Sequence, residues 1–147
     1  MRIIVDADAC PVKGEIERVA RKEKIELYFF ADVNHRISSD YATVVYVDQG
    51  ADSVDIALMN KAKQNDIIVS QDYGVASMAI GKGCYVIHPS GKFLDSSNID
   101  QLMFERHIAR KERKRNKRGP KFKKRTASDD QYFEEQLKKM IELYRTV

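Results

Sequence analysis

The sequence contains no tryptophan and only two cysteines, three prolines and seven glycines among its 147 residues. Cys10 and Cys84 lie far apart, and neither stands in a CxxC or Cys-to-His spacing, which excludes a disulfide framework and a structural zinc site. Hydrophobic residues nevertheless make up 43% of the chain, which is enough to bury a core and excludes a wholly disordered protein. We therefore expect a folded protein in a reducing compartment.

Long hydrophobic runs are absent as well. No uncharged apolar run approaches the roughly 18 residues that a membrane helix needs. The first residues, MRIIVDADACP, hold no signal-peptide hydrophobic region before Asp6. We therefore expect a cytoplasmic protein that has no membrane partner.

Negative charge is almost absent from one segment of the chain. Residues 106–125 contain 12 Lys or Arg and a single acid, Glu112, and so carry a formal charge of +11. Because the whole chain has 26 basic and 22 acidic residues, the remainder holds 14 basic and 21 acidic ones and carries −7. A run of positively charged residues lacks the alternating charges of a salt-bridged surface helix and is typical of a segment that binds a polyanion.

Short β-branched runs alternate with helical periods over the first two thirds of the chain. They predict strands and intervening helices: strands at residues 2–6, 25–31, 41–47, 67–70 and 84–87, and helices at 11–22, 52–64 and 73–81. Strands separated by helices favour a parallel sheet, because each crossover helix packs back onto the sheet. The predicted fold class is therefore α/β, with a three-layer α/β/α core over about residues 1–95 and a mostly parallel sheet.

Two further helices are predicted beyond this core. The first, at residues 98–118, loses its apolar pattern within a basic segment that spans about 98–125, and Gly119-Pro120 ends it. The second, at about 128–146, begins at a capping box whose first residue is Ser128. Its apolar face should be buried against the core or against a second copy in a homodimer, and consists of Phe133, Leu137, Met140, Ile141 and Tyr144. We expect residues 1–147 to form a single domain.

Acidic residues gather where the predicted strands end. Five aspartates end or follow a strand, or begin the helix after Gly50: Asp6, Asp8, Asp52, Asp55 and Asp72. The carboxyl ends of parallel strands meet at one edge of a sheet, which is where ligands bind. Clustered negative charges repel one another, so such a cluster normally persists because a cation neutralises it. Oxygen-only ligands indicate Mg²⁺ or Mn²⁺.

Two of these aspartates also have a local structural interpretation. Asp52 equally fits a helix cap, and Asp8 equally fits an Asx-turn within DADACP. Asp55 lies one helical turn after Asp52 and is less easily explained as a cap. Asp6 and Asp72 directly follow β-branched runs, and their positions favour a functional role most strongly.

Other polar side chains near the same edge are weaker candidates. The segment Asn34-His35-Arg36 follows the second predicted strand, so His35 and Arg36 are candidates for a phosphate contact, with a solvated surface loop as the alternative. Cys10 sits beside the acidic turn. Because negative charge disfavours a thiolate, we do not expect a cysteine nucleophile.

The chain carries four characteristic segments: VDADACPV, GADSVDIAL, IIVSQDYGVASMAIGKG and VIHPSG. They resemble the bacterial YaiI/YqxD family, and the similarity spans the whole chain, basic segment included. The core of that family looks like the PIN-like group of metal-dependent nucleases, which share a parallel α/β sheet and a cluster of acids at its carboxyl edge. The resemblance implies that Asp6, Asp55 and Asp72 are the catalytic, metal-holding acids. A fourth acid stays open between Asp52 and Asp95, and the DADACP turn departs from the wider PIN-like pattern.

The favoured function is a metal-dependent nuclease acting on RNA, which uses Mg²⁺ or Mn²⁺ at the acidic cluster to hydrolyse phosphodiesters. The basic segment would neutralise backbone phosphates through Arg110, Lys111, Arg113, Lys114, Arg115, Lys117, Arg118, Lys121, Lys123, Lys124 and Arg125. One alternative is a catalytically silent RNA-binding module with the same fold and basic segment. A weaker alternative is a haloacid dehalogenase-type phosphatase, in which Asp6 is the nucleophile and Asp8 the general acid.

Overall fold

The computed structural model describes residues 1–48, 50, 53–116 and 124–145 of the chain. Within these residues one sheet follows the order β3-β2-β1-β4-β5-β6, with strands β1 (Arg2–Asp6), β2 (Glu26–Asp32), β3 (Thr43–Val47), β4 (Ile67–Val69), β5 (Tyr85–Ile87) and β6 (Phe93–Leu94). Neighbouring strands from β3 to β5 are parallel, and β6 pairs antiparallel with β5. The predicted mostly parallel sheet is confirmed.

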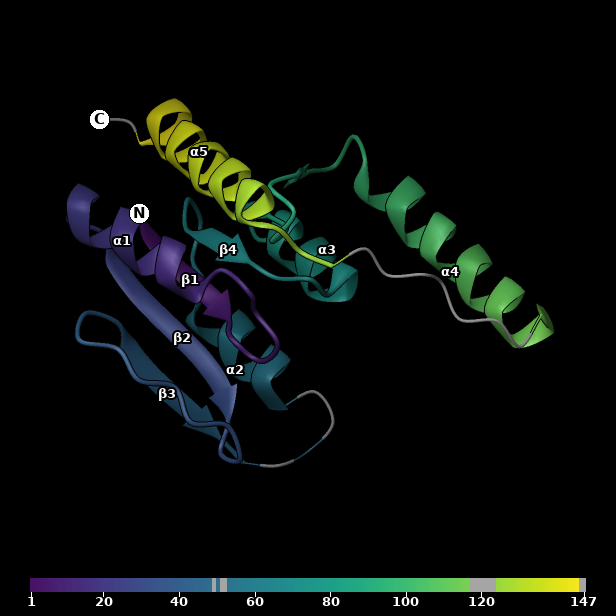
Figure 1. Ribbon diagram of the computed structural model, residues 1–147, viewed down its shortest axis with the longest axis horizontal. Coiled ribbons are helices and arrows are strands. Elements are labelled where there is room, and N and C mark those ends of the chain that lie inside the picture. The colour runs from purple at the N-terminus through teal and green to yellow at the C-terminus, as the bar shows by residue number, and fades with distance from the viewer. Residues whose placement is uncertain (49, 51–52, 117–123, 146–147) are drawn as a thin grey trace.

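Helices cover both faces of the sheet (Figure 1). On one face lie α1 (Lys13–Glu23) and α5 (Ala127–Tyr144), and on the other lie α2 (Ser53–Lys61) and α3 (Tyr73–Gly81). Each pair of helices closes its own hydrophobic cluster against the sheet. The predicted three-layer α/β/α architecture is therefore confirmed.

The central strand β1 shows how the sequence assigns side chains to the two faces. Ile3 and Val5 pack into the cluster beneath α1 and α5, whereas Ile4 packs into the cluster beneath α2 and α3. Side chains alternate along a strand, so Asp6 follows Ile4 to the side of α2 and α3. The last residue of β1 thereby presents a carboxylate to the helix whose first turn contains Asp55.

Helix α5 belongs to the core. Its apolar face is buried against the sheet and α1 through Phe133, Leu137, Met140 and Ile141, as predicted. Tyr144, predicted for the same face, is exposed at the end of the helix. The predicted cap at Ser128 is wrong. Thr126 is the N-cap: its side chain accepts from the Asp129 backbone N–H, while the Asp129 side chain accepts from the Thr126 backbone N–H. This reciprocal capping box starts the helix at Ala127 and leaves Ser128 within its first turn.

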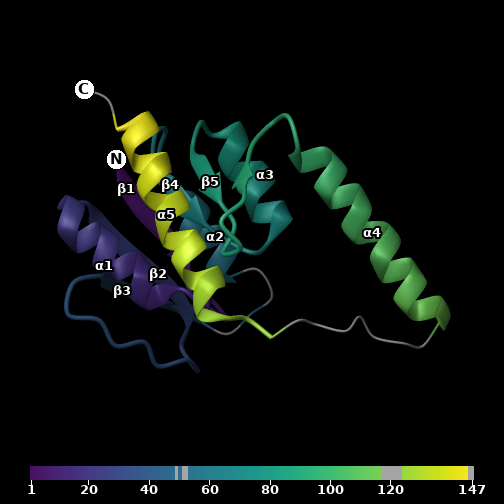
Figure 2. The same ribbon diagram turned by 45° about the horizontal axis from the view of Figure 1, so that its top comes forward.

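Helix α4 (Ile99–Asn116) is attached to the body only near its beginning, within the described residues. Ile99 and Leu102 pack in the cluster that contains α3. From Met103 to Arg115 the side chains are exposed, except for the half-buried Arg113. Figures 1 and 2 show this part of the helix projecting away from the three layers. The predicted break at Gly119-Pro120 lies outside the described residues.

The sequence did not predict β6, and the interpretation of residues 84–87 as the last strand is wrong. A tight turn after β5 returns the chain, with backbone hydrogen bonds joining His88 to Lys92 and Gly91 to His88. Gly91 adopts a φ of 93°, and an added Cβ would lie 2.8 Å from the Tyr132 ring. A two-residue strand beyond such a turn is too short to show a period in the sequence.

Candidate functional site

The strand order reverses between β1 and β4, because the chain first builds β2 and β3 on one side of β1 and then crosses to β4 on the other. In open α/β sheets the crevice at the carboxyl end of such a switch point is where ligands bind. Asp6 ends β1, and Ser70 directly follows β4. Asp72, two residues later, is the N-cap of α3. The structure therefore brings Asp6 and Asp72 to this one edge.

The half-buried Asp6 carboxylate lies in a region of concentrated negative charge. Burial raises the pKa of Asp6 to about 6, with contributions in the same direction from three carboxylates: Asp55, Asp8 and Asp72. The Ser70 hydroxyl opposes this shift by donating to Asp6 Oδ2 over 3.3 Å, and it accepts from the Asp72 backbone N–H at 3.0 Å. Sequence reasoning missed this serine, although Ser70 follows Val69, which pairs with Val5 on the neighbouring strand. A bound cation would relieve this repulsion.

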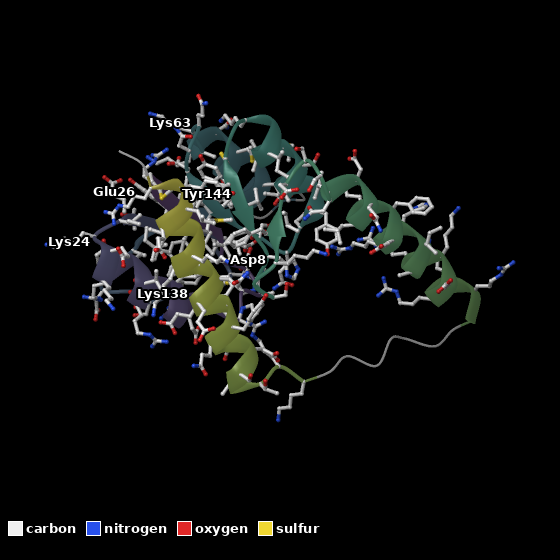
Figure 3. All side chains as sticks on the ribbon, turned by 90° about the horizontal axis from the view of Figure 1, so that it is seen from above. Asp8, Lys24, Glu26, Lys63, Lys138 and Tyr144 are labelled. Carbon is white, nitrogen blue, oxygen red and sulfur yellow. The ribbon has the colours of Figure 1, made fainter. Side chains whose placement is uncertain are left out.

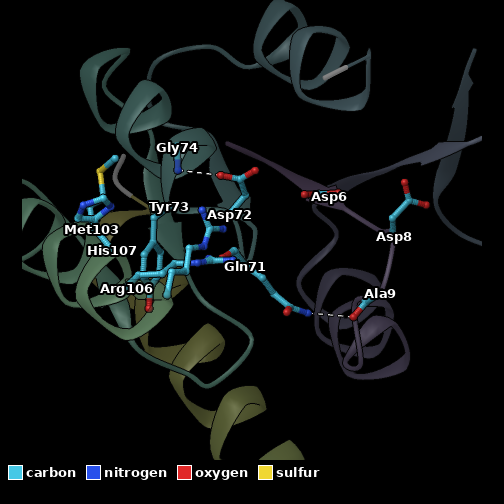
Figure 4. A pocket seen from close by; sticks show the side chains of 11 residues that line it. Asp6, Asp8, Ala9, Gln71, Asp72, Tyr73, Gly74, Met103, Arg106 and His107 are labelled. Carbon is cyan, nitrogen blue, oxygen red and sulfur yellow. Dashed lines mark hydrogen bonds between the residues drawn. The ribbon is translucent and has the colours of Figure 1, made fainter. Parts of the chain in front are cut away.

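Asp72 and Asp55 come to the site from two different helices. The Asp72 side chain caps α3, since its Oδ1 accepts from Gly74 N at 2.8 Å and Val75 N at 3.3 Å (Figure 4). Asp55 is half-buried in the first turn of α2 and acts on Asp6 through its charge. Helix N-termini favour negative charge, so both carboxylates are held where the helix dipoles stabilise them.

Asp8 has a different environment from the other acids. Its two carboxylate oxygens lie 3.2 and 3.3 Å from the Asp32 backbone N–H group, and His35 Nδ1 lies 2.8 Å from Oδ1. In Figure 4, Asp8 lies on the far side of Asp6 from Asp72. Asp8 thus links the end of β2 and the following loop to the end of β1. Of the two predicted phosphate contacts, His35 lies beside Asp8, and Arg36 is exposed. The next residue, Ala9, has a φ of 58°, which marks a strained turn.

Of the two candidates for a fourth acid, Asp52 lies outside the described residues. Asp95 follows β6, where its carboxylate accepts from the Ser97 backbone N–H and hydroxyl, as in an Asx-turn before α4. This local role explains Asp95 without a ligand.

A pocket of about 530 Å³ opens over the acids (Figure 4). One wall contains three of the predicted aspartates, Asp6, Asp8 and Asp72. The opposite wall is one face of α4, with Met103, Arg106, His107 and Arg110 at helical spacings of i, i+3, i+4 and i+7. An acidic wall and a basic wall therefore face each other across a space of ligand size.

Arg106 is fixed at the junction of the two walls. Its Nη1 donates to the Gln71 carbonyl oxygen over 3.4 Å, and its Cζ lies 5.6 Å from the Tyr73 ring centroid. The Gln71 side chain in turn donates to the Ala9 carbonyl oxygen at 2.9 Å. From the sequence, Arg106 and His107 were placed only within the basic helix and Gln71 was not a candidate, because their relation to the acids depends on how α4 docks on α3.

Positive charge accumulates beside this wall. Burial lowers the pKa of His88, and the charges of Arg106, Arg125 and Lys92 lower it further. Arg125 is held in place, because its guanidinium pairs with Asp130 and donates to the Pro89 carbonyl oxygen at 2.8 Å.

The structure describes six of the remaining residues predicted to bind nucleic acid. Lys124 is exposed near α5, and the others lie on α4: Arg110, Lys111, Arg113, Lys114 and Arg115. Four further predicted residues lie outside the described part of the chain: Lys117, Arg118, Lys121 and Lys123.

In the described part of the chain, no three His, Cys, Asp or Glu side chains form a group that could hold a metal ion by themselves. The donors at the edge are nevertheless carboxylate and hydroxyl oxygens, which suit a hard cation. Mg²⁺ usually binds one or two carboxylates and completes its shell with water and substrate phosphate. The residues present fit that mode of binding, and they do not fit an all-protein metal cage.

The chain is similar to proteins of one family over nearly its full length. Residues 4–143 match the family described as "Uncharacterized BCR, YaiI/YqxD family". The chain is 49% identical over 144 residues to a UPF0178 protein of Lachnoclostridium phytofermentans, covering 96% of this chain and 97% of the relative. It is 48% identical over 145 residues to a UPF0178 protein of Clostridium acetobutylicum, with the same coverage of 96% and 97%. No solved structure matches the chain, so the PIN-like resemblance stays a prediction. Among the described residues, no helix is long and apolar enough to cross a membrane.

Proposed function

The chain belongs to the YaiI/YqxD family, and from the geometry of its pocket we propose that it is a metal-dependent nuclease that hydrolyses RNA. The observation that carries this proposal is the pairing of the two pocket walls, acids on one side and the basic face of α4 on the other. A phosphodiester is an anion that a cation on the acidic wall would polarise. Arginines on the opposite wall would neutralise its neighbouring phosphates.

The acidic wall supports a role for a divalent cation. Mg²⁺ or Mn²⁺, when bound, supplies an activated water and positive charge at the reacting phosphate. Asp6 and Asp55 are the residues that would hold it, with Asp72 at the edge of the same cluster. Ser70 keeps the Asp6 oxygen oriented and favours its ionised, ligating form.

The alternative of a haloacid dehalogenase-type phosphatase has less support. That mechanism needs Asp6 as an ionised nucleophile and Asp8 as an acid beside it. Asp8 is instead engaged with His35 and the end of β2. A general acid that is turned to another partner argues against this chemistry. The catalytically silent RNA-binding module is separated from the nuclease by the experiment below.

The experiment uses the full chain, Mn²⁺ or Mg²⁺, and a 5′-labelled single-stranded RNA. We expect metal-dependent cleavage by the natural protein and at least a 100-fold lower rate for Asp6→Asn, because removing one interaction of the reacting site typically costs that much. Asp6→Asn should retain RNA binding, since it removes negative charge near the substrate. If the natural protein binds RNA but cuts neither RNA nor DNA with either metal, the silent module replaces the nuclease.

A further inference from the structure

The pocket has one feature that the proposed function does not explain, namely the fixed position of Arg106. The other basic side chains of α4 between Met103 and Arg115 are exposed, except for the half-buried Arg113, and they lie on the part of the helix that projects away from the three layers. Arg106 instead contacts the loop after β4 through Gln71 and lies over the Tyr73 ring. Figure 3 shows how far the remainder of α4 stands from the body.

These contacts orient the guanidinium and leave it largely available for a ligand. The Gln71 carbonyl takes one of the five N–H donors that an arginine carries. The guanidinium also lies over the Tyr73 ring, and the Arg106 side chain lines the pocket. Arg110, one turn later, lines the same wall. A planar fork held in this way matches two oxygens of one phosphate better than an ammonium group does.

We propose that Arg106 and Arg110 clamp a backbone phosphate of a single-stranded nucleic acid, the phosphate next to the one that lies over Asp6. The inference rests on the proposed function for the identity of the ligand. The size of the pocket, about 530 Å³, and its two opposed walls admit one nucleotide between α4 and the acids.

Gln71 links this clamp to the acidic wall. Its carbonyl accepts from Arg106, and its side chain donates to the carbonyl of Ala9, which follows Asp8 in the strained turn. One residue thus sets the distance between the basic and the acidic wall. Gln71 is a positioning residue, whereas Arg106 contacts the substrate.

Binding of a fluorescein-labelled 12-nucleotide oligo(U) RNA to the full chain in EDTA tests the clamp without cleavage. Arg106→Ala should weaken binding about 10- to 100-fold, as expected for a charge-assisted hydrogen-bonded pair. It should also reduce the slope of log affinity against log salt by about 0.7, which corresponds to one phosphate. Arg106→Lys should keep the slope of the natural protein but bind more weakly, because it retains the charge and loses the planar fork.

Arg21→Ala is the matched control. Arg21 lies in α1 with its Cζ 5.4 Å from the Tyr41 ring centroid, so the substitution removes the same charge and the same type of contact at the opposite edge of the sheet. We expect its affinity and salt slope to equal those of the natural protein. Equal affinities of Arg106→Ala and Arg21→Ala would overturn the clamp, as would an absence of RNA binding by the natural protein.

Competition and cleavage complete the test. Unlabelled oligo(U) should displace the probe at a concentration at least tenfold lower than oligo(U) annealed to oligo(A), and equal competition would overturn the single-strand preference. If Arg106→Ala lowers affinity as expected while the natural protein cuts no RNA, the clamp stands and the nuclease proposal fails. If the natural protein cuts RNA and Arg106→Ala binds and cuts equally well, the nuclease stands and the clamp fails.

Discussion

The last two helices have the same length, 18 residues each, and opposite relations to the core. In α5, four apolar side chains recur on one face and are buried: Phe133, Leu137, Met140 and Ile141. In α4, only Ile99 among the described side chains is buried, and Phe104 is 63% exposed. A sustained apolar face holds α5 to the sheet, whereas in α4 the apolar pattern ends after Ile108 and gives way to arginine and lysine.

This difference separates stability from recognition within the chain. Helix α5 closes the hydrophobic cluster beneath α1, so its contribution is to the free energy of unfolding. Helix α4 contributes little buried surface and instead presents one face to the acids at the switch point. Substitutions in α5 should therefore change stability, and substitutions in α4 should change binding.

The largest expected effect is that of Phe133→Ala. Phe133 is fully buried, and truncating a buried phenylalanine should lower the free energy of unfolding by about 3–5 kcal/mol. Phe104→Ala in α4 is the matched control and should change it by about 0.5 kcal/mol or less. Urea unfolding followed by circular dichroism measures both. Similar losses for the two variants would contradict the assignment of different roles to α4 and α5.

Asp6→Asn should have the next largest effect, and it should stabilise the protein. The pKa of Asp6 is about 6 when folded and 3.8 in the reference state, so the folded protein binds this proton more tightly. Stability is then lost as the pH rises from about 4 to about 6. Without divalent metal, Asp6→Asn should gain about 1–3 kcal/mol at pH 8, and the gain should disappear below pH 4.

Thermal melts of both proteins from pH 3.5 to 8 in EDTA measure this difference. Asp40→Asn, a substitution of an exposed acid at another site, should melt as the natural protein does at each pH. A gain for Asp6→Asn that does not vary with pH would show that it arises from packing and not from the titration of the carboxyl group.

The smallest expected effect on stability belongs to the triple variant Arg113→Ala, Lys114→Ala, Arg115→Ala. These side chains lie on the projecting part of α4, so the melting temperature should stay within about 2 °C of the natural value. The salt slope of RNA binding should fall by about 2, since each neutralised phosphate on a single strand contributes about 0.7. Fluorescence anisotropy between 50 and 300 mM salt measures this slope, and an unchanged slope would remove Arg113, Lys114 and Arg115 from the RNA-binding surface.

Local patterns were enough to predict the parallel strands and the exposed nature of α4. The strand Arg2–Asp6 and the helix Tyr73–Gly81 have the predicted bounds, because β-branched runs and the Asp72 cap are encoded within a few residues. The helix start at Thr126 was missed in favour of Ser128, since both fit a capping sequence and only the backbone geometry decides between them.

The site itself depends on contacts between distant segments. That Asp6 and Asp72 share an edge follows from strand order, which sequence rules can supply. The pairing of Asp8 with His35 and the docking of Arg106 on Gln71 join residues 27 and 35 positions apart. No period or motif encodes these contacts, so they could not be predicted from the sequence.

The central claim is that the acids at the switch point hold a divalent cation through Asp6. Titration of the natural protein with Mn²⁺ at pH 7, with unbound Mn²⁺ followed by electron paramagnetic resonance, tests it most directly. We expect saturable Mn²⁺ binding that Mg²⁺ displaces, with an affinity that is at least tenfold lower for Asp6→Asn and unchanged for Asp40→Asn. Equal Mn²⁺ affinity in Asp6→Asn and the natural protein, or no binding by either, would contradict it.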